Sequence, residues 1–131
     1  MLNETRRLKD MQTTIRRIAA VIGWCAVLAI AFATVAPIAS RPHFPDAGPD
    51  VERFFGFLLL AGSLAVAYPR RRGLVLILAI GFAIGLEAAQ LLEPTRHGRP
   101  HDAIVKMLGV MAGVALAVLM ERLARRLHRA T

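Results

Sequence analysis

Two isolated charges stand inside otherwise apolar stretches of this chain. Glu87 is the only charged residue within residues 73–92, and Lys106 is the only one within residues 103–120. A charged side chain at the centre of a membrane helix costs about 2.5–3.5 kcal/mol, so such a residue is expected where it pairs or binds something. Two opposite charges on consecutive apolar stretches therefore predict a shared polar site near one membrane surface.

Other polar side chains flank these stretches at the same predicted membrane surface, and we predict that all of them converge on one outward-facing cavity. The predicted ligand-binding set is Asp50, Arg53, Glu87, Gln90, Arg96, Arg99, Asp102 and Lys106. Its cations outnumber its carboxylates by one. The planar fork of arginine suits phosphate and carboxylate groups. Lipid phosphate is the nearest abundant anion at a membrane surface, so the expected ligand is the headgroup of an anionic lipid.

Three alternatives use the same residues. Glu87 would pair with Lys106, Arg53 or Arg99 and simply hold helices in register. Alternatively, Glu87 and Asp102 would be the catalytic acid and base of a small membrane enzyme acting on a lipid-linked headgroup. The third alternative is a small four-helix exporter, but transporters place their coupling carboxylate near the midplane of the bilayer. Glu87 lies five residues from the end of its stretch, about 7–8 Å along a helix.

A metal site is a weaker possibility in the segment between the last two apolar stretches. Its candidate ligands would be Glu93, His97, His101 and Asp102. Two histidines four residues apart bind metal well only on a helix, and Gly98 and Pro100 disfavour a helix there. We therefore expect neither a metal nor a cofactor.

Four apolar stretches must position these side chains, at about residues 18–39, 51–68, 73–92 and 103–123. Each is about 18–22 residues long, enough to cross a hydrocarbon layer of about 30 Å. The chain is 56% hydrophobic with a mean hydropathy of +0.50. We predict an all-α membrane protein, a four-transmembrane-helix bundle over residues 18–123, with a basic segment at 1–17 and a basic tail at 124–131.

Basic residues predict the orientation of this bundle. Twelve of the 17 lysines and arginines fall within residues 6–17, 70–72 and 122–129. The positive-inside rule then predicts a multi-pass membrane protein with both termini cytoplasmic. The same clusters attract anionic lipids, so membrane lipids are the expected partners.

The net charge of +8 comes with no nucleic-acid readout motif, and no nucleic-acid partner is expected. The sequence gives no indication of the oligomeric state.

Spaced glycines suggest how the helices pack. Gly81 and Gly85 lie in the third apolar stretch, and Gly109 and Gly113 lie in the fourth. A spacing of four residues lets two membrane helices approach closely. Because Glu87 points roughly opposite to Gly81 and Gly85, we predict that the third helix is central and contacts neighbours on two faces.

The ordered combination of these motifs resembles the VanZ-like family of small bacterial membrane proteins over about residues 37–115. The matching residues are Glu87 with Gln90, Pro94 with Arg96 and His97, Asp102 with Lys106, Gly109 with Gly113, and Asp50 with Arg53 and Phe54. Many members have a histidine near Phe54 and an asparagine at the position of Lys106. The resemblance implies a cell-envelope protein of the bacterial cytoplasmic membrane, and it implies no particular reaction. It extends the expected ligands to the headgroup of a lipid-linked envelope precursor.

Overall fold

The computed structural model describes residues 2–35, 48–91 and 100–130, and this part of the chain is helical. The helices are α1 (Leu2–Val35), α2 (Pro49–Ala67), α3 (Arg72–Leu91) and α4 (Pro100–Ala130), with a single 3₁₀ turn, η2 (Pro69–Arg71), between α2 and α3. The predicted all-α class is confirmed.

Two predicted boundaries do not coincide with the ends of helices. The basic segment 1–17 and the first apolar stretch form one continuous helix, α1, and the basic tail continues α4 as far as Ala130. The sequence contains no glycine or proline between residues 2 and 22 or between residues 114 and 130, so nothing in the backbone interrupts either helix there. Residues 17 and 123 mark a change of polarity along a helix. Residues 36–39 and 92, at the predicted ends of two stretches, lie outside the described residues.

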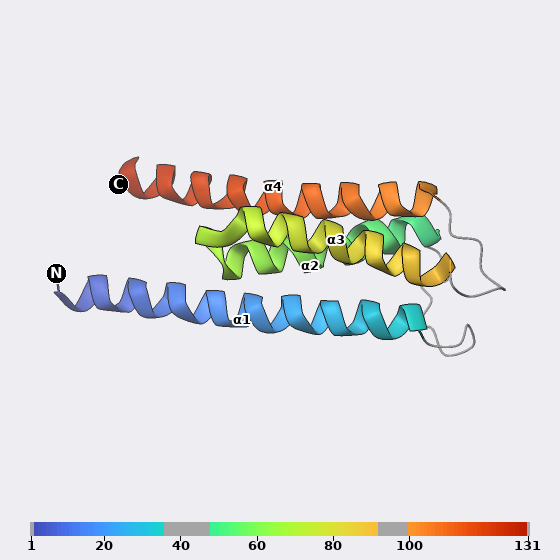
Figure 1. The fold of residues 1–131 in the computed structure, drawn as a ribbon. Helices are drawn as coiled ribbons and strands as arrows, with labels where there is room; N and C mark the ends of the chain where they lie inside the picture. The colour runs from blue at the N-terminus through green and yellow to red at the C-terminus, as the bar shows by residue number, and fades with distance from the viewer. Residues whose placement is uncertain (1, 36–47, 92–99, 131) are drawn as a thin grey trace.

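The four helices run side by side along one direction, and successive helices alternate in direction (Figure 1). The start of α1 and the end of α4 lie at one end of the bundle, which we call the terminal end, and η2 also faces this end. At the opposite end α2 and α4 begin and α3 finishes, and we call it the charged end.

The central helix is α2, because its contacts with α4 and α1 are the most extensive in the described bundle and it also packs against α3. The prediction that the third helix is central is therefore wrong. The buried core is formed by Phe57, Leu60 and Ala61 of α2, Ala79 and Ala83 of α3, and Val110 of α4. The small alanines of α3 let it approach α2 closely, but most of the remaining surface of α3 faces away from the other helices.

The glycines explain why α2 is central. A Cβ atom on Gly113 would lie 2.8 Å from the backbone nitrogen of Gly62, and one on Gly109 would lie 3.2 Å from the carbonyl carbon of Phe54. The spaced glycines of α4 thus form the close contact with α2. Gly81 and Gly85 have open space around them, because they face away from the described helices.

Three helices are long and apolar enough to cross a membrane, namely the segments Arg6–Thr34, Pro69–Gln90 and Pro100–Leu127. Many of their large apolar side chains are exposed, with Leu28 and Ile77 each 69% accessible. Exposed apolar surface of this extent is expected where lipid covers the protein. The protein is therefore a membrane-spanning helical bundle.

Candidate functional site at the charged end

Helix starts and one helix end bring the charged side chains together. Asp50 and Arg53 lie in the first two turns of α2, Asp102 and Lys106 lie in the first two turns of α4, and Glu87 lies near the end of α3. Proline occupies the beginning of both α2 and α4, where its missing N–H leaves no helical hydrogen bond unmade. Each carboxylate in a first turn also faces the positive end of its own helix dipole.

A buried ion pair joins α3 to α4. Lys106 Nζ donates to Glu87 Oε1, and the two residues are only 5% and 8% exposed. Lys106 Nζ also lies 5.9 Å from the centroid of the Phe57 ring, within the range of a cation–π contact. The sequence left Lys106, Arg53 and Arg99 open as partners of Glu87. Lys106 is the partner among the described residues, Arg53 pairs elsewhere, and Arg99 lies outside the described residues.

A second cluster joins α2 to α4. Arg53 Nη1 donates to Asp102 Oδ1 at 3.0 Å and to Asp50 Oδ1 at 3.1 Å. Asp102 is only 9% exposed, so its pairing with Arg53 offsets the cost of burying a carboxylate. Together the two clusters connect α2, α3 and α4 at the charged end.

The outer edge of this second cluster is Asp50, which is exposed to solvent. The ring of His101 lies with Nε2 3.1 Å from Asp50 Oδ2. The hydrogen bond from His101 is the largest influence on the pKa of Asp50 and lowers it, while loss of solvation raises it and the charges of His101 and Arg53 lower it further. The net effect places the pKa of Asp50 below its usual value, which favours the ionised form.

One oxygen of the buried pair has no partner. Glu87 Oε2 is buried, and no described residue donates a hydrogen bond to it. A carboxylate oxygen accepts up to two hydrogen bonds, and leaving it without a donor in a buried place costs free energy. Among the described side chains, Glu87 Oε2 is therefore the atom that would gain most from a hydrogen bond donated by another group.

Of the other predicted site residues, Gln90 is the one that the structure describes. Gln90 is half-buried one turn beyond Glu87 and makes no hydrogen bond to the clusters within the described residues. Arg96 and Arg99 lie outside the described residues, as do Glu93 and His97 of the candidate metal set. The predicted surplus of cations depends on Arg96 and Arg99 and stays a prediction.

Sequence analysis missed an interaction at the terminal end. Arg72 Nη2 and Arg125 Nη2 both donate to Glu121, and Arg72 Nε donates to the carbonyl oxygen of Ala65 at 3.2 Å. These arginines were interpreted from the sequence as determinants of topology that also attract anionic lipids. The available signal was Glu121 itself, the only acidic residue after Asp102 and four residues before Arg125 on the same helix face.

Comparisons of the chain with protein-family models, with curated proteins and with solved structures found no match. The chemistry of the described residues is therefore the basis for a function. The two clusters fix three helices at one end of the bundle, and among the described side chains they leave one buried oxygen, Glu87 Oε2, without a hydrogen-bond donor.

Proposed function

We propose that this protein is a VanZ-like integral membrane protein of the bacterial cell envelope that binds an anionic headgroup at its charged end. The headgroup belongs to an anionic lipid or to a lipid-linked envelope precursor. In this proposal all four helices cross the cytoplasmic membrane, the terminal end is cytoplasmic, and the charged end faces outward.

The arrangement of the helices supports this topology. The basic clusters at 6–17, 70–72 and 122–129 lie on the parts of α1, η2, α3 and α4 that are nearest the terminal end (Figure 1), as the positive-inside rule requires of a cytoplasmic face. The 19 residues of α2 give it a length of about 28 Å, close to the thickness of the hydrocarbon layer. Its charged residues, Asp50, Glu52 and Arg53, are confined to the end that would face the headgroups.

The observation that carries the proposal is the unpartnered Glu87 Oε2. A hydroxyl group of a glycerol or sugar headgroup would supply the missing hydrogen-bond donor. The phosphate of the same headgroup would then be bound by Arg96 and Arg99, the phosphate ligands expected from the sequence. A ligand with both a phosphate and a hydroxyl group fits this combination.

The pairing favours binding over catalysis by Glu87 and Asp102. General acid–base catalysis by these two residues needs both carboxyl groups to face one substrate, whereas each is held by a different cation. Glu87 Oε1 is occupied by Lys106, and Asp102 Oδ1 is occupied by Arg53. Both carboxylates thus already have a cation as partner, which suits a structural and binding role.

Native mass spectrometry of the purified full chain tests the proposal with two anionic lipids of equal charge. Phosphatidylglycerol carries hydroxyl groups, whereas phosphatidylmethanol does not. We expect phosphatidylglycerol to bind about 2–10-fold more tightly, the effect of one hydrogen bond of about 0.5–1.5 kcal/mol. Equal binding of the two lipids would contradict the role of Glu87 Oε2.

Two arginine variants complete this experiment. Arg99→Ala is expected to lose bound phosphatidylglycerol, because it removes a phosphate ligand. Arg125→Ala is the matched control, since Arg125 is exposed near the terminal end, and it should retain the lipid bound at the charged end. If Arg99→Ala retains as much lipid as Arg125→Ala does, the charged end does not bind the phosphate.

A further inference from the structure

A groove of about 450 Å³ lies between α1, α2 and α3, on the half of the bundle nearest the terminal end. Trp24 lines it from α1, Leu60 and Leu64 line it from α2, and Leu78 and Phe82 line it from α3. This volume is in the range of small-molecule sites, about 300–1,000 Å³. The apolar lining along three helices suits a hydrocarbon chain.

The groove becomes polar where α2 meets η2. Trp24 Nε1 donates to the hydroxyl oxygen of Tyr68 at 3.3 Å, so the hydrogen of that hydroxyl remains available to donate. Arg71 also lines the groove, and its guanidinium has no carboxylate partner among the described residues. The next residue, Arg72, is instead paired with Glu121. The polar end of the groove thus offers hydrogen-bond donors and one positive charge, which together select an anion.

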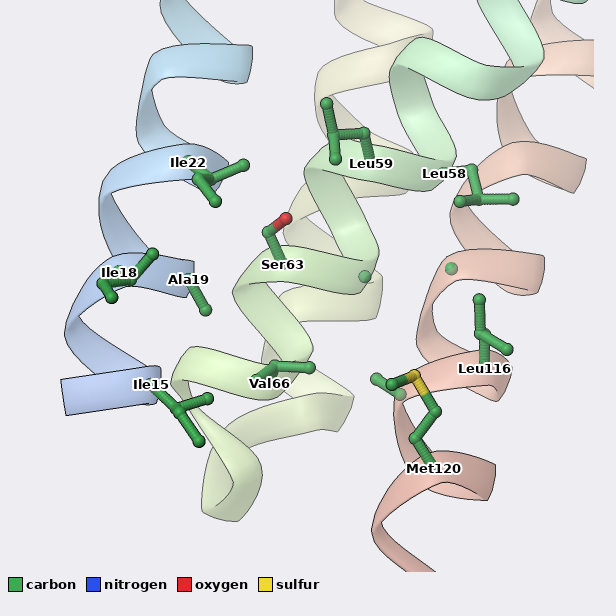
Figure 2. Close-up of a pocket in the computed structure, with 13 residues that line it drawn as sticks. Ile15, Ile18, Ala19, Ile22, Leu58, Leu59, Ser63, Val66, Leu116 and Met120 are labelled. Atoms are coloured by element: carbon green, nitrogen blue, oxygen red, sulfur yellow. The ribbon is translucent and has the colours of Figure 1, made fainter. Parts of the chain in front are cut away.

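A second groove, between α1, α2 and α4, provides a contrast (Figure 2). Apolar side chains such as Ile18 and Leu116 line most of it, and Ser63 contributes the only hydroxyl group. No charged residue is among its lining residues, so it suits hydrocarbon of any lipid. Of these two grooves, the one that ends at Arg71 combines an apolar lining with an anion-selective end.

We propose that the groove between α1, α2 and α3 binds an anionic phospholipid from the leaflet at the terminal end of the bundle. One acyl chain lies along Leu64 and Leu78, and the phosphate accepts hydrogen bonds from Arg71 and the Tyr68 hydroxyl. Aromatic residues commonly lie at the membrane–water interface, and arginine attracts anionic lipid there. This lipid site lies toward the opposite end of the molecule from the proposed headgroup site and does not depend on it.

The single tryptophan makes this proposal directly testable, because Trp24 is the only one in the chain and lines the groove. The full chain is reconstituted into phosphatidylcholine vesicles that contain the same mole fraction of either brominated phosphatidylglycerol or brominated phosphatidylcholine. Bromine on an acyl chain in the groove quenches the fluorescence of Trp24. We expect an apparent preference for phosphatidylglycerol of roughly fivefold, the contribution of one arginine near a membrane surface.

Variants of two neighbouring arginines separate the groove from general surface charge. Arg71→Gln should abolish the preference, whereas Arg70→Gln should keep it, because Arg70 is exposed and is not among the residues that line the groove. Tyr68→Phe keeps the ring but removes the donor, and it should weaken the preference. Each variant is normalised to its own fluorescence without brominated lipid.

Two results would overturn the proposal. The first is equal quenching of the wild-type protein by both brominated lipids. The second is an equal loss of preference in Arg70→Gln and Arg71→Gln, which would show that surface charge alone attracts the lipid. Arg99→Ala should leave the quenching of Trp24 unchanged. The proposal of this lipid site and that of the headgroup site at the charged end can therefore be rejected independently.

Discussion

The charged end buries its ion pairs, with Glu87, Asp102 and Lys106 each less than 10% exposed, and these pairs join α2, α3 and α4. At the terminal end, Glu121 pairs with Arg72 and Arg125 in a cluster that joins α3 to α4. The side chains of Arg72 and Glu121 are 20% and 26% exposed, and that of Arg125 is 71% exposed, so this cluster is partly open to solvent. Acidic and basic residues of α4 thus form ion pairs in two environments, buried at the charged end and more exposed at the terminal end.

This difference should determine how much each cluster contributes to stability. Water and salt screen an exposed pair, which typically contributes about 0–1 kcal/mol. A buried pair contributes little net free energy when intact, but removing one partner leaves a charge without compensation and costs about 3–5 kcal/mol. The charged end should therefore be sensitive to substitution and the terminal end tolerant of it.

The largest expected effect comes from Glu87→Ala, which leaves Lys106 buried without a carboxylate partner. We expect the free energy of unfolding to fall by about 3–5 kcal/mol. Glu121→Ala is the matched control, and it should cost no more than about 1 kcal/mol. Thermal melting of both variants in the same detergent measures the difference, and equal losses would remove the distinction between the two ends.

A smaller effect is expected where α4 packs against α2 and keeps the charged end in register. A methyl group added at Gly113 would meet the carbonyl oxygen of Leu58 and the backbone nitrogen of Gly62. Gly113→Ala should therefore cost about 1–3 kcal/mol through overpacking. Gly81→Ala is the control, because open space surrounds Gly81, and its effect should stay within about 0.5 kcal/mol. Similar melting temperatures for the two variants would contradict the observed contact between α2 and α4.

The smallest expected effect is a dependence of stability on pH at the exposed edge of the charged end. The folded protein lowers the pKa of Asp50, mainly through His101. The stability that ionised Asp50 provides is therefore complete above its unfolded pKa of about 3.9, and it is lost as the pH falls through the lower folded value. Wild type and Asp50→Asn should thus converge in melting temperature in strong acid. A difference in melting temperature between the two proteins that grows as the pH falls would contradict this prediction.

The charged end was partly predictable from particular residues. Glu87 and Lys106 are each alone in a long apolar stretch, and the cost of an unpaired charge in such surroundings indicates that they meet. The sharing of Arg53 between Asp50 and Asp102 was not predictable in the same way, because several acids and bases flank the helices at similar depth. The choice among them depends on the rotation of α2 against α4.

The identity of the central helix also depended on the packing. The spaced glycines of α3 and α4 are equivalent as sequence motifs, yet Gly109 and Gly113 contact α2 while Gly81 and Gly85 contact nothing nearby. A motif of this kind shows that a close approach is permitted, and it does not identify the partner. The interaction of Trp24 with Tyr68 was missed for a similar reason, since 44 residues separate them in the chain.

By itself, the amino-acid sequence determined the helical class, the long apolar spans and the isolated charges within them, because these depend on local composition and on the cost of placing polar groups in hydrocarbon. Only the tertiary structure decided which cation meets which carboxylate, which helix lies at the centre and which oxygen of Glu87 is left without a donor. Those outcomes depend on how each helix is rotated about its axis, and that rotation is set by contacts between residues far apart in the chain.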